Sequence, residues 1–415
     1  MKSKNIAFYC DNLFGFYTLK PIVDKYQSKK YEIFIYTRQN NIDILKEYLD
    51  NTTNTQVISI ESLDDIFLRG MNYIFKKYFT NPKFTQMYYR QRRNDRENFY
   101  HKYIGKYFYI ADENINNIYQ KLFGIFKNRF KSKLLISISR VHSNYLVCSK
   151  SIKHISIMES WDHPVKTPYW HNPDFLLTWN KALKQDFQKY QNFKDTKISY
   201  ITPLKFRYIQ EREKENIDNL KNTLQNKEFI DDIGKIKNKQ MVMYIATTSS
   251  INPLQHQGEM QLIEQLCEAT KQLGRTLYVK PKPNSPSGDY DIFKEKYENA
   301  IVGAYATNSN SIDMLDEEYH TFRYLLLYYS NLIVNFGTTF VLESSLMDKP
   351  ILQLDLSKEY YGEFGEYSTN LHIQKYLLKE HSFKVTSVHD IVKVMTTKKE
   401  SFSAYSKNLK EWLNE

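Results

Sequence analysis

The chain has 415 residues, 41% of them hydrophobic, and a formal net charge of +11. This length suits two or three domains with full cores, and the apolar fraction is typical of a folded globular protein. No apolar run approaches the roughly 20 residues of a membrane-spanning helix. Three distant cysteines, Cys10, Cys148 and Cys267, form no CxxC or Cys/His cluster, so the sequence indicates no zinc site and fits a reducing cytoplasm.

The positive charge is concentrated in one stretch. Residues 66–133 hold 15 Lys and Arg against 4 Asp and Glu, which equals the excess of the whole chain, and they also hold 18 Phe and Tyr. Interleaved basic and aromatic residues suit an anionic membrane surface or a polyanionic acceptor. One alternative is a helical insertion whose aromatic residues form a core and whose Lys and Arg side chains are solvated. Another is contact with nucleic acid, but we expect no nucleic-acid partner.

The first 60 residues alternate between strands and helices. Strands are predicted at 5–10, 31–37 and 55–60, with a helix in each interval. This rhythm predicts a parallel, doubly wound sheet, and the opening apolar run is too short for a signal peptide. Ligands of such sheets bind at the carboxyl ends of the strands. Asp11 follows the first strand and is therefore a candidate general base, or alternatively a helix cap.

Long helices are predicted for 61–131, and strands return at 133–140 and 154–160. The proline-rich loop that follows, ESWDHPVKTPYWHNPDFLLTWN, gathers polar and aromatic side chains after one strand end. A rigid interdomain loop whose His and Trp pack against core is the alternative. If the loop is functional, an acid/base group or a ligand for acceptor hydroxyls could come from Glu159, Asp162 and His163. Trp161 and Trp170 are then the candidates for stacking on a sugar.

In the second half, a strand near 240–246 leads into a hydroxyl-rich turn with Thr247 and Thr248. These threonines are expected either to bind a diphosphate or to form an ordinary turn. A later strand ends in Lys280-Pro281-Lys282-Pro283. Two lysines held by prolines at a strand end can neutralise a phosphate, and a solvated loop is the alternative.

Residues 331–356 (NLIVNFGTTFVLESSLMDKPILQLDL) predict a strand, a turn, a helix and a second strand. The first N–H groups of a helix lack internal partners and attract anions. Gly337 permits close approach of a phosphate, Thr338 and Thr339 offer hydroxyls, and Glu343 lies on the same helical face as Thr339, suited to ribose hydroxyls. Alternatively, Thr338 caps the helix and Glu343 is solvated.

This strand, G-[ST]-[ST] turn, Glu-bearing helix and Lys-Pro strand start resembles the nucleotide-binding half of GT-B glycosyltransferases. Residues 240–356 also resemble CDP-glycerol glycerophosphotransferases and Kdo transferases of bacterial surface-polymer synthesis, although Lys282 stands where their K/R-P-H-P segment often has His. The SWD of 160–162 is similar to a loop of some bacterial surface-carbohydrate transferases. The donor-binding residues that these patterns imply are Thr247, Thr248, Lys280, Lys282, Gly337, Thr338, Thr339 and Glu343.

The resemblance implies an α/β fold of GT-B architecture, with two doubly wound Rossmann-like domains that face a cleft. We expect an acceptor-side domain at 1–203 with a helical basic-aromatic insertion at about 61–131, a connection at 204–238, and a donor-binding domain at 239–375. Helices at 376–415 are expected to cross back to the first domain.

The expected function is metal-independent transfer of a sugar from a nucleotide-activated donor to a cell-surface polysaccharide or glycolipid, in the cytoplasm or on the inner face of its membrane. Asp289-Tyr290-Asp291 matches the metal-binding D-x-D of GT-A enzymes but lies in a Ser/Pro/Gly loop, so we predict no metal and no cofactor. The alternatives are glycerophosphotransfer from CDP-glycerol and a non-catalytic surface-carbohydrate assembly protein. NDP-sugar 2-epimerase activity is disfavoured because its usual acidic and His cluster is not evident.

Overall fold

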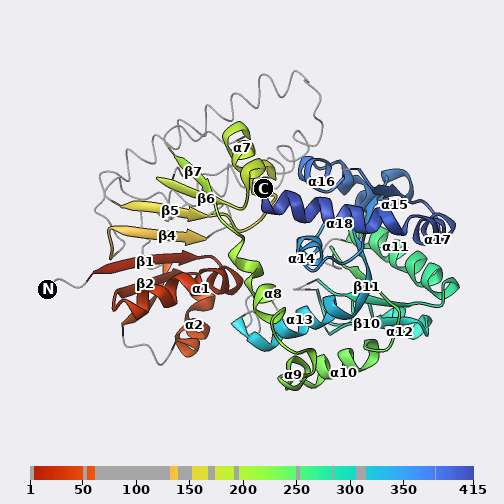
Figure 1. The fold of residues 1–415 in the computed structure, drawn as a ribbon, viewed down its shortest axis with the longest axis horizontal. Coiled ribbons are helices and arrows are strands. Elements are labelled where there is room, and N and C mark those ends of the chain that lie inside the picture. Colours follow the sequence, from red (N-terminus) through yellow and green to blue (C-terminus); the bar gives the residue numbers. More distant parts are fainter. Residues whose placement is uncertain are drawn as a thin grey trace. The chain divides into compact units, whose positions relative to one another are not determined.

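The computed structural model describes residues 4–49, 54–60, 131–138, 152–166, 173–190, 196–248, 253–282, 285–304, 315–378 and 380–415. The chain divides into two compact units, Met1–Lys205 and Phe206–Glu415 (Figure 1). Each unit is built on one sheet whose described strand pairs are all parallel. Most of the predicted insertion, residues 61–130, and Trp170 lie outside the described residues.

The first unit contains a seven-stranded sheet in the order β3-β2-β1-β4-β5-β6-β7. Strand β1, which lies between β2 and β4, is buried throughout from Ile6 to Cys10, as expected of an apolar strand inside a parallel sheet. The strands are β1 (Asn5–Cys10), β2 (Glu32–Thr37), β3 (Thr55–Ser59), β4 (Leu134–Ile138), β5 (Lys153–Ile157), β6 (Phe175–Thr178) and β7 (Lys197–Tyr200). The helices are α1 (Leu13–Ser28), η1 (Gln39–Asn41), α2 (Ile42–Tyr48), α6 (His163–Lys166) and α7 (Lys181–Tyr190).

The second unit contains a six-stranded sheet in the order β10-β9-β8-β11-β12-β13. Its strands are β8 (Met241–Ile245), β9 (Thr276–Lys280), β10 (Ala300–Val302), β11 (Ser330–Asn335), β12 (Ile351–Asp355) and β13 (Ser382–Lys384). One hydrophobic core joins the sheet to α11 (Pro253–Gln272), α15 (Lys358–Glu366) and α17 (Val388–Thr397). The close approach of α11 to α15 requires Gly258, because a Cβ there would lie 2.2 Å from the main-chain oxygen of Tyr361.

The remaining helices of the second unit pack on one another and on the sheet. Helix α13 contacts α8, α9 and α10, which fold from the residues expected to connect the two domains, and α18 contacts α14 and β12. None of the helices in the described parts of the chain has the length and apolar character of a membrane span. The bounds are η4 (Leu204–Phe206), α8 (Arg207–Arg212), α9 (Ile217–Asn222), α10 (Lys227–Ile236), α12 (Asp291–Lys296), α13 (Glu317–Tyr329), α14 (Phe340–Leu346), η6 (Tyr367–Thr369), α16 (Leu371–Tyr376) and α18 (Lys399–Asn414).

Candidate functional site

Lys280 is the buried cation at the carboxyl end of β9. The residue is 7% exposed, and its ammonium lies 5.3 Å from the centroid of the Phe340 ring. Within the described parts of the chain this ammonium has no hydrogen bond and no ion pair. Burial and the nearby positive charge of Arg323 lower the pKa of Lys280 to about 8, while the Glu343 carboxylate opposes this shift. The site therefore holds an ammonium at the edge where ligands of parallel sheets bind.

Glu343 of α14 forms a buried ion pair beside Lys280. Nη2 of Arg323 on α13 donates to both of its carboxylate oxygens, at 2.5 Å to Oε1, and the Tyr208 hydroxyl of α8 donates to Oε2. Burial alone would lower the pKa of Arg323, but the Glu343 carboxylate raises it above its usual value. Arg323 alone pairs with this carboxylate, and Lys280 lies close enough to feel the charges of both groups.

This arrangement gives Glu343 partners inside the protein. The carboxylate was expected to accept hydrogen bonds from ribose hydroxyls, or else to be solvated. It is neither exposed nor unpartnered, because Glu343 is 2% exposed and is held by Arg323 and Tyr208. Contact with a ribose stays a prediction.

The turn between β11 and α14 is stabilised by Asn335. Its Oδ1 accepts from the main-chain N–H of Thr338 at 3.2 Å and from the Thr338 hydroxyl at 2.8 Å. Thr339 is the residue before the seven-residue helix α14, and its side chain makes no capping hydrogen bond. A Cβ on Gly337 would lie 3.0 Å from Cε1 of Tyr367, so any larger residue here would press on the Tyr367 ring. Contacts of these three residues with phosphate stay predictions.

Thr247 and Thr248, at the end of β8, both donate to Glu259 of α11. The fully buried Glu259 carboxylate accepts from the main-chain N–H groups of Thr247, at 2.6 Å, and Thr248, at 2.9 Å, and from both threonine hydroxyls. The hydroxyls of Tyr244 and Tyr290 also donate to it, at 2.8 and 3.1 Å. Glu259 was not among the residues predicted from the sequence, because no local pattern links it with the two threonines.

The two predicted lysines differ in burial, and two residues of the D-x-D pattern make contacts within the protein. Lys282 is exposed, whereas Lys280 is buried. Tyr290, the central residue of the D-x-D pattern, donates to the main-chain oxygen of Thr248 at 2.7 Å, and Asp291 pairs with Lys294 at 2.7 Å. Among the described residues, no group of three or more His, Cys, Asp and Glu side chains is placed to hold a metal ion. Metal independence stays a prediction.

In the first unit, Asp11 and Glu159 follow the carboxyl ends of β1 and β5. Oδ1 of Asp11 accepts from the Tyr9 hydroxyl and from Nε of Arg38 at 3.1 Å. Asn12 is the cap of α1, since its Oδ1 accepts from the N–H of Gly15 at 2.7 Å, and its Nδ2 lies 3.5 Å from Oε1 of Glu159. The structure therefore brings two predicted carboxylates to one edge and assigns the cap to the neighbouring residue.

The other predicted residues of this unit are buried around Glu159. Trp161, Asp162 and His163 are each less than a tenth exposed, as is Glu159, and His163 begins α6. The burial matches both interpretations of the loop, namely a site for acceptor hydroxyls and a rigid packed connection. Which carboxylate or imidazole acts as a base stays a prediction.

Lys205 is a residue of this region that the sequence did not single out. Its ammonium donates to the main-chain oxygen of Glu159 at 3.1 Å and lies 4.8 Å from the Trp179 ring and 5.7 Å from the Phe14 ring. The residue is 6% exposed. A second buried ammonium thus lies at the carboxyl edge of the first sheet.

Comparison with known proteins gave likeness in structure only. No protein-family model matches the chain, and no curated protein sequence matches it. The structure is similar to UDP-GlcNAc 2-epimerase from Methanocaldococcus jannaschii in complex with UDP-GlcNAc and UDP, with a TM-score of 0.51 and 12% identity, over 99% of this chain and 98% of that chain. The chain has the GT-B fold. At this identity the likeness shows the fold alone.

Two further solved structures lie at lower similarity. UDP-GlcNAc 2-epimerase from Neisseria meningitidis bound to UDP-GlcNAc has a TM-score of 0.49 and 10% identity, over 99% of this chain and 97% of that chain. A variant of the wall teichoic acid polymerase TagF has a TM-score of 0.47 and 12% identity, over 100% of this chain and 84% of that chain. The predicted α/β fold class and the GT-B resemblance are confirmed at the level of fold.

Proposed function

We propose that this GT-B protein is a glycosyltransferase. It moves a sugar from a nucleotide-activated donor to a cell-surface polysaccharide or glycolipid acceptor, and it requires no metal ion. The observation that carries the proposal is the buried Lys280 ammonium, which has neither a hydrogen bond nor an ion pair with any described residue. The fold is compatible with this activity but does not select it.

The charge of the cluster explains why a phosphate is the expected ligand. A buried ammonium is unfavourable unless an anion or hydrogen-bond acceptors compensate it. Arg323 already engages the Glu343 carboxylate, so a further anion is needed to compensate Lys280. The diphosphate of a nucleotide sugar supplies such an anion, and its charge grows as the bond to the sugar breaks. A preorganised cation would then stabilise the leaving group without a metal.

The first unit supplies the candidates for binding and activating the acceptor. In an inverting reaction the acceptor oxygen bonds to the anomeric carbon, the bond from that carbon to the phosphate oxygen breaks, and the acceptor proton passes to a base. Asp11, Glu159, Asp162 and His163 are the candidates. Of these, Asp11 is held by Arg38 and Glu159 lies beside Asn12. Trp161 and Trp170 are the candidates for stacking on the acceptor.

A thermal-shift screen against UDP, CMP, CDP, GDP and dTDP, with and without Mg²⁺, tests the proposal. A ligand at 100 times its dissociation constant stabilises a protein by roughly 2.7 kcal/mol. We expect a metal-independent shift with one nucleotide that is lost in Lys280→Met. Lys349→Met is a matched control, because burial also lowers the pKa of Lys349 but its ammonium donates to the main-chain oxygen of Tyr328.

The outcome of this screen separates the alternatives. A shift with CDP, followed by release of CMP from CDP-glycerol, would replace the sugar transferase with a glycerophosphotransferase. Conversion of an NDP-sugar to its 2-epimer without an acceptor would identify an epimerase. No shift with any nucleotide would favour a non-catalytic assembly protein. Contact of residues 66–133 with an anionic membrane is a separate proposal, and absence of co-sedimentation with anionic vesicles at low salt would contradict it.

A further inference from the structure

Two arginines of the second unit are buried at α13, and they differ in how many of their nitrogens are paired. Arg212 extends from α8 to this helix, whereas Arg323 is part of it. Their exposed fractions are 7% and 8%. Burying the N–H groups of a guanidinium is unfavourable unless each finds an acceptor. The partners of each nitrogen therefore indicate whether the protein alone satisfies an arginine.

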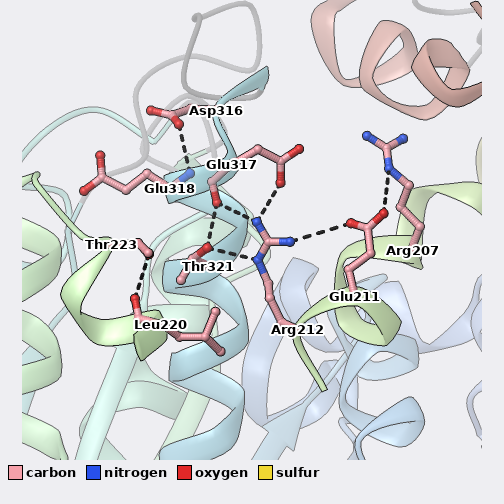
Figure 2. A network of polar contacts seen from close by, with 9 residues as sticks. All are labelled: Arg207, Glu211, Arg212, Leu220, Thr223, Asp316, Glu317, Glu318 and Thr321. Atoms are coloured by element: carbon pink, nitrogen blue, oxygen red, sulfur yellow. Dashed lines mark hydrogen bonds and ion pairs between the residues drawn. The ribbon is translucent and has the colours of Figure 1, made fainter. Parts of the chain in front are cut away.

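Arg212 has an acceptor near every nitrogen of its guanidinium. Figure 2 shows Nη2 donating to the Glu317 carboxylate, at 2.6 Å, and to the Glu317 main-chain oxygen, at 3.1 Å. Nε donates to the Thr321 hydroxyl at 3.0 Å, and Nη1 lies 3.6 Å from Oε2 of Glu211. The protein thus satisfies Arg212, whose role is to join α8 to α13.

Arg323 pairs with its carboxylate through a single nitrogen. Nη2 donates to both oxygens of Glu343, whereas Nε is buried and has no hydrogen-bond partner among the described residues. The central carbon of the guanidinium lies 5.3, 5.7 and 5.4 Å from the ring centroids of Tyr208, Tyr319 and Phe340. An aromatic face attracts a cation but accepts only a weak hydrogen bond. The Nε–H group therefore lacks a full acceptor.

Lys280 is a second buried cation with an unpaired donor at the same place. Its ammonium lies 5.3 Å from the centroid of the Phe340 ring, which also contacts Arg323, and the described residues give it no hydrogen bond and no ion pair. Burial, and then the charge of Arg323, lower the pKa of Lys280, so the two cations are close enough to interact. One anion beside this ring can accept from both.

We propose that Arg323 is a second ligand of the phosphate site, and that its Nε–H binds the same anion as the Lys280 ammonium. The proposal rests on the proposed function, because it takes the donor phosphate as that anion. Glu343 holds the guanidinium by Nη2 and leaves Nε for the ligand. A phosphate fits this place, since its oxygens accept from both a guanidinium and an ammonium. The proposal gives Arg323 a reason to pair through one nitrogen rather than two.

Calorimetric titration of the full-length chain with inorganic pyrophosphate, and with each nucleotide of the thermal-shift screen, tests the proposal. The variant combines Arg323→Met with Glu343→Gln, which keeps the net charge of the site and leaves neither member of the ion pair without its partner. We expect its affinity for the anion to fall roughly tenfold or more, because a hydrogen bond between charged groups is lost. If Arg323 serves only as the partner of Glu343, the affinity stays the same.

Two further proteins make the result specific. Arg323→Lys keeps a cation for Glu343 but has no Nε–H, so we expect the same loss of affinity, and this variant decides the question if circular dichroism shows the double variant to be unfolded. Arg212→Met combined with Glu317→Gln is the matched control, because it removes the other buried arginine at α13 together with its carboxylate. We expect the control to bind as the wild type does.

The outcomes separate this proposal from the proposed function. If a nucleotide binds equally well to the wild type and to the Arg323 variants, the role of Arg323 is overturned and the proposed function stands. If pyrophosphate binds in a manner that depends on Arg323 but no nucleotide binds, the anion site stands and the proposed function fails. If none of these anions binds to the wild type, both are overturned. An equal loss of affinity in the Arg212 control would also overturn the role of Arg323.

Discussion

Replacement of Lys280 by methionine is expected to stabilise the fold and to abolish phosphate binding. Burial first, and then the charge of Arg323, lower the pKa of Lys280 from 10.5 to about 8. Each pKa unit corresponds to about 1.4 kcal/mol, so the charged form costs the folded state roughly 3 kcal/mol at pH 7. Methionine keeps most of the apolar stem without the charge. We therefore expect the free energy of unfolding to rise by roughly 1–3 kcal/mol.

The pH dependence of this gain follows from the sign of the shift. The unfolded chain keeps the Lys280 proton up to its ordinary pKa of 10.5, whereas the folded chain releases it near 8. The cost is complete below pH 8 and declines as the pH rises to 10.5, because the folded state is then neutral. The advantage of Lys280→Met should accordingly shrink between pH 8 and 10.5.

Urea unfolding followed by circular dichroism at pH 7 and pH 10 measures both effects, with Lys349→Met as the control. A variant that is less stable than the wild type at pH 7, or whose gain is the same at both pH values, would refute the reasoning. Undiminished nucleotide affinity of Lys280→Met would also refute the reasoning, because the buried ammonium would then not be the group that binds the phosphate.

Three further predictions concern the fold around the two sites. Glu343→Gln should cost roughly 3 kcal/mol or more in urea unfolding, because Arg323 loses its buried counter-ion, and a loss under 1 kcal/mol would contradict the ion pair. Gly337→Ala should cost about 1–3 kcal/mol, since its Cβ would press on Tyr367, and unchanged stability would show that the turn yields freely. Burial lowers the pKa of His154 to about 3, so below pH 6.5 only the unfolded chain gains this proton. Stability should then fall by about 1.4 kcal/mol per pH unit towards pH 3, and a slope that His154→Gln leaves unchanged would refute this.

Most of the strands were predictable because they are short apolar runs between turn signals, whereas β13 (Ser382–Lys384) is not such a run and was not predicted. The predicted strand at 5–10 is β1, and the predicted strand at 55–60 covers β3 (Thr55–Ser59). The alternation with helices predicted parallel pairing, which both sheets show. The burial of a parallel sheet on both faces produces these runs, so local sequence carries the information.

The partners within the sites were not predictable, because they depend on contacts between distant residues. Tyr208 and Glu343 are 135 residues apart, and Glu159 and Lys205 are 46 apart. No local pattern marks such pairs. The two lysines of the Lys280-Pro281-Lys282 run also look equivalent in sequence, and only the end of β9 against Phe340 distinguishes the buried one.

The most direct test of the central claim is the proton balance of nucleotide binding at pH 8, obtained by calorimetry in two buffers of different ionisation enthalpy. About half of the Lys280 side chains are neutral in the free protein at this pH, because their pKa is about 8. A phosphate in contact with the ammonium favours its charged form. The account predicts uptake of about half a proton per nucleotide bound in the wild type and none in Lys280→Met. Binding without proton uptake, or with equal uptake in both proteins, would contradict a phosphate site at Lys280.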